Sequence, residues 1–164
     1  MNTIAVDAMG GDSAPIDIVK GAIKAKEQGV DVVLCGDKDL INPYLENYEI
    51  PVFDFPQVIS MDEDPLKAIR NKKNASIVGC MQLLKDKKVQ AVFSAGSTGA
   101  TLISAISILG KHKGVIRPVI ASVLPSLSGN TILLDSGASL DVKPKVLFQY
   151  GITVSYTHLR AHET

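Results

Sequence analysis

Short apolar runs and helically spaced apolar residues alternate along the first part of the chain. The runs TIAVDA (3–8) and VDVVLCG (30–36) are rich in apolar and β-branched residues and lie next to glycines, which is typical of buried strands. Between them, apolar residues recur at helical spacing, at Ile16, Val19, Ala22 and Ile23. This segment predicts a helix with Asp12 or Ser13 as its cap and Pro15 in its first turn.

The same alternation continues through the rest of the chain. Four further strands are predicted, at 51–55, 89–96, 117–125 and 130–137. Three helical regions are also predicted: one from Asp64 to Leu84 with a break near Asn74, one over 98–111, and one that starts at Pro144. The second of these is apolar on nearly every face and should be buried, and the third should direct Val146, Leu147 and Tyr150 inward. The polar stretch 37–50 carries no predicted element.

Strands that alternate with helices are typical of an α/β fold, here a largely parallel sheet with flanking helices. With 164 residues, the chain is long enough for one domain with a substantial core. Ligands of such folds bind beyond the carboxyl ends of the strands. The loops that follow strands are therefore where functional residues are expected.

Charge and composition narrow the class of protein. Lys+Arg and Asp+Glu both number 17, so the formal net charge is zero and no nucleic-acid partner is expected. The two cysteines, Cys35 and Cys80, make neither a disulfide framework nor a zinc site and are interpreted as core residues rather than nucleophiles. The N-terminus lacks a basic region, and the apolar stretch 100–109 is too short to cross a bilayer. A cytoplasmic protein is predicted, with peripheral membrane association left open.

Three loops that follow predicted strands are rich in glycine and small residues: DAMGGD (7–12), SAGSTGA (94–100) and DSGASLD (135–141). A helix N-terminus offers unpaired amides and the positive end of the helix dipole, and both attract phosphate-like anions. The glycines have a second interpretation, because they also permit tight turns and close packing. No dinucleotide or P-loop motif is present. The candidate phosphate-binding residues are Asp7, Met9, Gly10, Gly11, Asp12, Ser94, Gly96, Ser97, Thr98, Gly99, Asp135, Gly137 and Asp141.

Two charged features remain open at this point. The loop carboxylates can cap helices, bind a metal or orient a basic partner, and capping is the favoured role of Asp12, with no recognised metal-ligand spacing. The segment MDEDPLKAIRNKK (61–73) is acidic first and basic afterwards, which suits a solvated helix. Its alternative is a docking surface for an acidic partner, made by Lys67, Arg70, Lys72 and Lys73.

Four stretches, in this order, resemble the bacterial phosphate acyltransferase family: IAVDAMGGDSAP, MDEDPLKAIRNKK, SAGSTGA and LLDSGASLDVKP. The resemblance covers residues 1 to about 152. The chain departs from the family pattern at Ser97, where Asn is usual, and at Ser136 and Ser139, which replace Val and Asn.

The resemblance implies a fold like that of phosphotransacetylases and the isocitrate/isopropylmalate dehydrogenases. It also implies transfer of a fatty acyl group from acyl carrier protein to inorganic phosphate, which gives acyl phosphate for phospholipid synthesis. The implied enzyme is a homodimer that needs no metal and no cofactor, and any membrane contact would come through the downstream membrane acyltransferase. Residues 1–152 would be the N-terminal part of its α/β acyltransferase domain.

Residues 153–164 depart from the family pattern and resemble translated adapter sequence joined to a truncated gene, so His158 and His162 are given no function. A truncated chain would carry the phosphate-side loops without a complete site. Two alternatives stay open: a phosphotransacetylase or dehydrogenase of the same broad fold, and a non-catalytic module that binds phosphate or nucleotides. Turnover of acyl-CoA, nicotinamide binding, or anion binding without thioester turnover would distinguish them.

Overall fold

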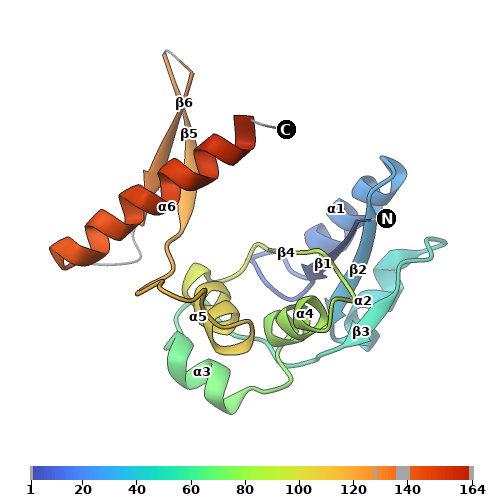
Figure 1. The fold of residues 1–164 in the computed structure, drawn as a ribbon. Coiled ribbons are helices and arrows are strands. Elements are labelled where there is room, and N and C mark those ends of the chain that lie inside the picture. Colours follow the sequence, from blue (N-terminus) through green and yellow to red (C-terminus); the bar gives the residue numbers. More distant parts are fainter. Residues whose placement is uncertain (1, 128, 136–140, 163–164) are drawn as a thin grey trace. The chain divides into compact units, whose positions relative to one another are not determined.

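The computed structural model describes residues 2–127, 129–135 and 141–162, with residues 156–162 described as backbone alone (Figure 1). Its contacts divide the chain into two compact units, Met1–Gly110 and Lys111–Thr164, which are described separately below.

The first unit is built on a four-stranded parallel sheet in the order β3-β2-β1-β4. Its strands are β1 (Thr3–Asp7), β2 (Asp31–Gly36), β3 (Val52–Asp54) and β4 (Ala91–Ser94), all within segments predicted as strands. The side chains of β1 and β2 alternate between the two faces, so that Val6 and Leu34 join one apolar cluster while Ala5 and Val33 join another. The predicted α/β fold with a parallel sheet is confirmed.

Helices cover both faces of this sheet (Figure 1). Helix α1 (Ile16–Glu27) and α2 (Lys38–Leu45) pack on one face, and α4 (Ser76–Lys85) packs on the other. Helix α5 (Thr98–Ile108) packs against both α4 and α3 (Pro65–Asn71), and Ile69, Ile77 and Ala100 share one buried cluster. The predicted break near Asn74 is confirmed, because α3 and α4 are separate helices.

The first unit differs from the prediction at two helix starts. Helix α1 begins later than predicted, with Pro15 at its N-cap position and no side-chain cap, so the capping role given to Asp12 or Ser13 is wrong. Helix α2 was not predicted at all. The Asp37 carboxylate caps it by accepting hydrogen bonds from the amides of Asp39 (2.9 Å) and Leu40 (3.3 Å). Its buried side chains are Ile41 and Leu45.

Helix α5 is less buried than its composition predicts. Its buried residues are Ala100 and Ser104, while Ile103, Ala105 and Ile108 are partly buried against α3 and α4. The reason is that these two helices cover one side of α5, and a helix that is apolar all round needs neighbours on every side to be buried.

The second unit consists of the antiparallel hairpin β5 (Ala121–Ser126) and β6 (Gly129–Leu134), followed by α6 (Pro144–His162). Both strands were predicted, but they form a two-stranded sheet of their own rather than part of the parallel sheet. The inward orientation predicted for α6 holds for Tyr150, which is 2% exposed, and is wrong for Leu147, which is 63% exposed. Among the residues that the structure describes, no helix is long and apolar enough to cross a membrane.

Candidate anion-binding site

The loops that follow β1 and β4 meet at the carboxyl end of the sheet, because these two strands are neighbours and Asp7 pairs in register with Ser94. The Ser94 hydroxyl donates a hydrogen bond to Asp7 Oδ2 at 2.7 Å and accepts one from the Gly96 amide at 3.1 Å. Asp7 is 4% exposed. A buried carboxylate is thereby held by a charge-assisted hydrogen bond between residues far apart in the sequence.

Glycine is required where the two loops touch. A Cβ on Gly10 would lie 2.5 Å from Asp7 Oδ2 and 3.0 Å from the Gly96 nitrogen, and a Cβ on Gly96 would lie 3.0 Å from Gly10 Cα. Gly11 has a φ of 116°, a conformation that favours glycine. Of the two interpretations of these glycines, close packing therefore holds for Gly10 and Gly96.

The two loops and the start of α4 enclose a small recess, which we call the β1–β4 recess. Its volume is about 10 Å³. That is room for roughly one water-sized group. The lining residues are Asp7, Met9, Gly10, Ile59, Ser76, Ile77, Ser94, Gly96, Ser97, Ala100 and Thr101. An atom the size of one oxygen fits inside it, and a larger anion would extend out of its open side.

Two helices begin at this recess. Ser97 is the N-cap of α5, where its hydroxyl oxygen accepts a hydrogen bond from the Ala100 amide at 3.3 Å. Helix α4 begins at Ser76 after Ala75, which provides no side-chain cap. Within the described ranges, the Ile77 amide has no hydrogen-bond acceptor, and neither does the Ser76 hydroxyl, although both residues are 3% exposed. Buried donors without acceptors at a helix N-terminus are favourable sites for an anion.

Comparison with known proteins identifies the family of this chain. The profile of the family described as "Fatty acid synthesis protein" matches residues 2–161. The chain belongs to this fatty acid synthesis protein family. Its resemblance to phosphate acyltransferases, drawn from four motifs, is confirmed.

Individual relatives of this family member agree with that assignment. It is 46% identical over 157 residues to a protein of Desulforamulus reducens named phosphate acyltransferase, with 93% of this chain and 47% of that protein covered. A protein of the same name from Gloeothece citriformis is 47% identical over 156 residues, with 91% and 44% covered. The chain therefore spans about half the length of the curated relatives it matches.

A solved structure shares the fold of this family member. A phosphotransacetylase from Streptococcus pyogenes superposes with a TM-score of 0.60 and 14% sequence identity, covering 87% of this chain and 48% of that chain. At this level of identity the match shows the fold alone.

Within the first unit, the structure brings six of the candidate residues together at the recess. Asp7, Met9, Gly10, Ser94, Gly96 and Ser97 line it. Thr98 and Asp12 are exposed, and a Cβ on Gly99 would meet Pro65 at 2.9 Å, so Gly99 serves packing against α3. In the second unit, Asp135 accepts a long hydrogen bond of 3.5 Å from the Tyr150 hydroxyl, Asp141 is exposed, and Gly137 lies outside the described residues together with Ser136 and Ser139.

Sequence reasoning missed the contribution of α4 to the recess. Ser76 was not a candidate because it follows no strand, although the predicted break near Asn74 already implied a helix start close to it. No group of three or more His, Cys, Asp or Glu residues gathers as a metal site in the part of the chain that the structure describes.

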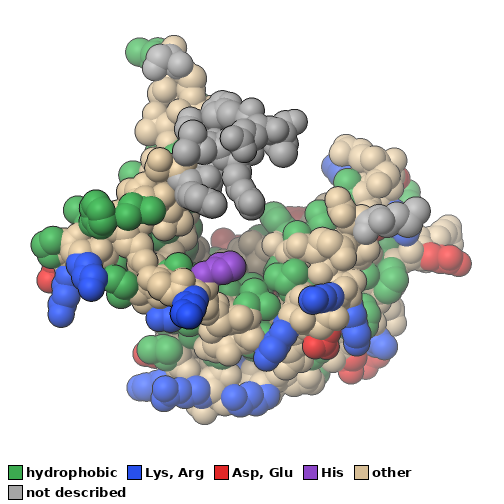
Figure 2. Space-filling view, viewed as in Figure 1, with side chains coloured by type: hydrophobic (Ala, Val, Ile, Leu, Met, Phe, Trp, Pro, Cys, Tyr) green, Lys and Arg blue, Asp and Glu red, His purple; other side chains and the backbone are tan. Residues whose placement is uncertain are grey.

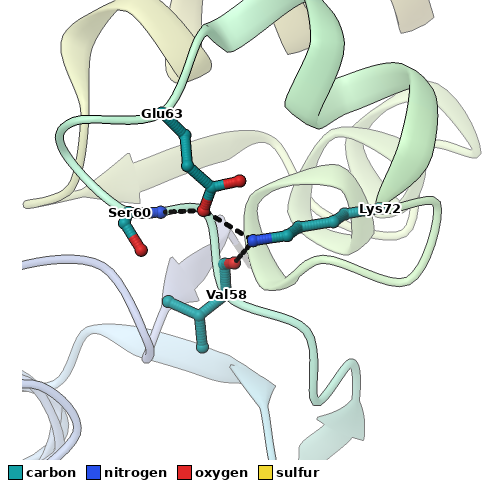
Figure 3. A network of polar contacts seen from close by, with 4 residues as sticks. All are labelled: Val58, Ser60, Glu63 and Lys72. Atoms are coloured by element: carbon teal, nitrogen blue, oxygen red, sulfur yellow. Dashed lines mark hydrogen bonds and ion pairs between the residues drawn. The ribbon is translucent and has the colours of Figure 1, made fainter.

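The basic residues of this chain that were predicted as a docking surface lie on α3 and directly after it. Lys67, Arg70 and Lys73 are exposed, and Figure 2 shows Lys and Arg side chains along the lower edge of this unit, over α3. Lys72 differs from these three, because its ammonium donates to Glu63 Oε1 at 2.5 Å and to the Val58 carbonyl at 2.7 Å (Figure 3).

The Glu63 carboxylate also accepts a hydrogen bond from the Ser60 amide at 2.8 Å, as Figure 3 shows. The hydrogen bond from Lys72, followed by the one from the Ser60 backbone, lowers the pKa of Glu63 below its ordinary value. This contact, which we call the Glu63–Lys72 clip, fastens the loop before α3 to the end of the same helix. Lys72 is therefore held within the unit, unlike its three basic neighbours.

Cys35 and Cys80 lie in the same buried cluster between the sheet and α4, and both are fully buried. The pKa of the Cys80 thiol is raised, first by its hydrogen bond to Cys35 and second by burial. A protonated, inaccessible thiol is a poor nucleophile. The two cysteines are therefore part of the core.

Proposed function

We propose that this chain forms the phosphate side of an enzyme that transfers an acyl group from a thioester to inorganic phosphate. The observation that carries the proposal is the β1–β4 recess, which is lined by buried donors that have no acceptor among the described residues. The relatives of this chain are named phosphate acyltransferase, which agrees with an anion site there. The donor chemistry suits a phosphate oxygen.

The chemistry requires no nucleophile from the protein. An oxygen of hydrogen phosphate forms the new bond to the thioester carbonyl carbon, the carbon–sulfur bond breaks, and the leaving thiolate takes the proton that the phosphate carried. The protein has to hold phosphate against the carbonyl and stabilise the developing negative charge. Cys35 and Cys80 are buried, which is compatible with a mechanism in which phosphate rather than a protein thiol is the nucleophile.

The proposed thioester donor is acyl carrier protein, and the proposed role is the supply of acyl phosphate for phospholipid synthesis in the cytoplasm. Lys67, Arg70 and Lys73 are exposed, and the same segment exposes two apolar side chains, Met61 and Leu66, which are 57% and 53% exposed. Positive charge next to apolar side chains suits an acidic partner that also offers an apolar contact. The complete enzyme is proposed to be a homodimer that meets the membrane through the enzyme that consumes its product.

A docking experiment tests the carrier surface separately from the chemistry. Reversal of Lys67 and Lys73 to Glu should weaken binding of acyl carrier protein, because both side chains are exposed and cationic. Reversal of Lys88, an exposed lysine in the turn after α4, is the matched control. If the wild type, the Lys67/Lys73 double variant and the Lys88 variant bind the carrier with equal affinity, α3 is not the docking surface.

The activity itself is tested by mixing the protein with inorganic phosphate and with acyl carrier protein that bears a fatty acyl thioester. Any acyl phosphate that forms is trapped with hydroxylamine. The assay is run with this chain and with the same chain extended by the C-terminal half of a full-length relative. Phosphate-dependent hydroxamate from the extended protein supports the proposal. The contrary result is an extended protein that folds and binds phosphate but gives no hydroxamate with either the acyl-loaded carrier protein or acyl-CoA. That result would refute the proposed acyl transfer and favour a non-catalytic phosphate-binding role.

A further inference from the structure

The β1–β4 recess combines two features that oppose each other electrostatically. The starts of α4 and α5 place positive helix ends and unpaired donors at it. Asp7, which also lines it and is 4% exposed, places a carboxylate there. A fully deprotonated anion would be attracted by the first feature and repelled by the second.

The hydrogen bonds around Asp7 determine what a ligand can offer it. Oδ2 accepts the Ser94 hydroxyl at 2.7 Å, and Oδ1 accepts the Met9 amide at a long 3.4 Å. A carboxylate has about four acceptor positions. Asp7 therefore keeps acceptor capacity, and a ligand satisfies it by donating a proton.

Ser94 cannot be the donor to the ligand. Its single hydroxyl proton is directed to Asp7, and its oxygen already accepts the Gly96 amide. The donors that remain belong to the two helix starts. The Ser76 hydroxyl has no hydrogen-bond partner in the described part of the chain although Ser76 is 97% buried, since its exposed fraction is 3%. The Ser97 oxygen accepts the Ala100 amide, which leaves its hydroxyl proton available.

Resting on the phosphate site proposed above, we propose that the recess selects a protonated tetrahedral oxyanion, hydrogen phosphate, with Asp7 as the acceptor of its hydroxyl group. The enclosed volume of about 10 Å³ takes one oxygen, and that oxygen is the protonated one beside Asp7. The unprotonated oxygens receive the donors of Ser76 and of the helix starts. Sulfate keeps no proton at neutral pH and is rejected by Asp7, whereas arsenate keeps one and is accepted.

The test is equilibrium dialysis of the chain with radiolabelled inorganic phosphate at neutral pH, in competition with sulfate or arsenate. Arsenate should compete about as well as phosphate, and sulfate at least tenfold more weakly. Ser76→Ala should weaken phosphate binding by about tenfold or more, the equivalent of one hydrogen bond to a charged group, without loss of the preference. Asp7→Asn should bring the affinities for phosphate and sulfate within about threefold of each other.

Ser104→Ala is the matched control, because Ser104 is also buried in this part of the unit but its hydroxyl donates to the Thr101 carbonyl at 2.9 Å, and it does not line the recess. It should bind phosphate like the wild type. Equal competition by sulfate and arsenate in the wild-type protein, or no phosphate binding at all, overturns the inference without any variant.

These outcomes are separable from the activity. Selective phosphate binding without thioester turnover would leave the inference standing and remove the proposed enzyme. Phosphate-dependent turnover that sulfate and arsenate inhibit equally would do the reverse.

Discussion

Replacement of Gly10 by alanine tests the close approach on which the site geometry depends. The new Cβ would lie 2.5 Å from Asp7 Oδ2 and 3.0 Å from both the Gly96 nitrogen and the Ser94 hydroxyl oxygen. Since Cβ atoms do not approach oxygen so closely, either the backbone loops separate or the Asp7 carboxylate leaves Ser94. Overpacking destabilises by about 1–3 kcal/mol, and the loss of a hydrogen bond to a charged group by about 1.5–3 kcal/mol. We expect a loss of about 2–4 kcal/mol in the free energy of unfolding.

The measurement is urea unfolding followed by far-ultraviolet circular dichroism, with Gly21→Ala as the matched control. Gly21 lies within α1, and a Cβ there would meet nothing within 4 Å. The same glycine-to-alanine change should therefore stabilise the chain by about 0.5–1 kcal/mol through helix propensity. If Gly10→Ala shifts the urea midpoint in the same direction as Gly21→Ala, the argument from close packing is refuted.

Three further outcomes follow from contacts described above. Ser97→Ala should lower the free energy of unfolding by about 1 kcal/mol through the lost α5 cap, whereas a stability equal to that of the wild type would show that the cap contributes nothing. Because the pKa of Glu63 is lowered, the Glu63–Lys72 clip stabilises the fold above pH 4.5 and ceases to do so as the pH falls through the depressed pKa. The difference in melting temperature between the wild type and Glu63→Gln should therefore vanish in acid. A difference that stays constant with pH would contradict this. Cys80 should react with a thiol reagent only after denaturant is added, and prompt labelling of the native chain would show that it is accessible.

The sequence was most informative where local pattern and topology coincide. Apolar runs bounded by glycine located β1, β2 and β4, and the rule that parallel strands present their carboxyl ends at one edge made Asp7 and Ser94 candidate site residues. That these two residues are direct neighbours follows from the pairing of β1 with β4, which the sequence did not predict. The glycine-rich composition did not by itself distinguish an anion site from close packing. That distinction needed the distances around Gly10.

The misses have physical causes in tertiary structure. Helix α2 contains Pro43 in its interior, so its local sequence resembles a loop. The Asp37 cap and the burial of Ile41 stabilise the helix despite this proline. Whether a buried side chain has a hydrogen-bond partner likewise cannot be predicted from the sequence. Ser76 is a site residue because it is buried at the start of α4 and its hydroxyl has no acceptor among the described residues.

The bond between Ser94 and Asp7 joins residues 87 positions apart, and this separation has a consequence for how the chain folds. Closing a loop of that length costs about 4 kcal/mol of chain entropy from the length-dependent term alone, which contacts between β1 and β4 must offset. At translation rates of about 5–20 residues per second, Asp7 is synthesised about 4–17 s before its partner exists. During that interval the nascent chain can pair β1 with β2, while the carboxylate of Asp7 stays in water until β4 arrives.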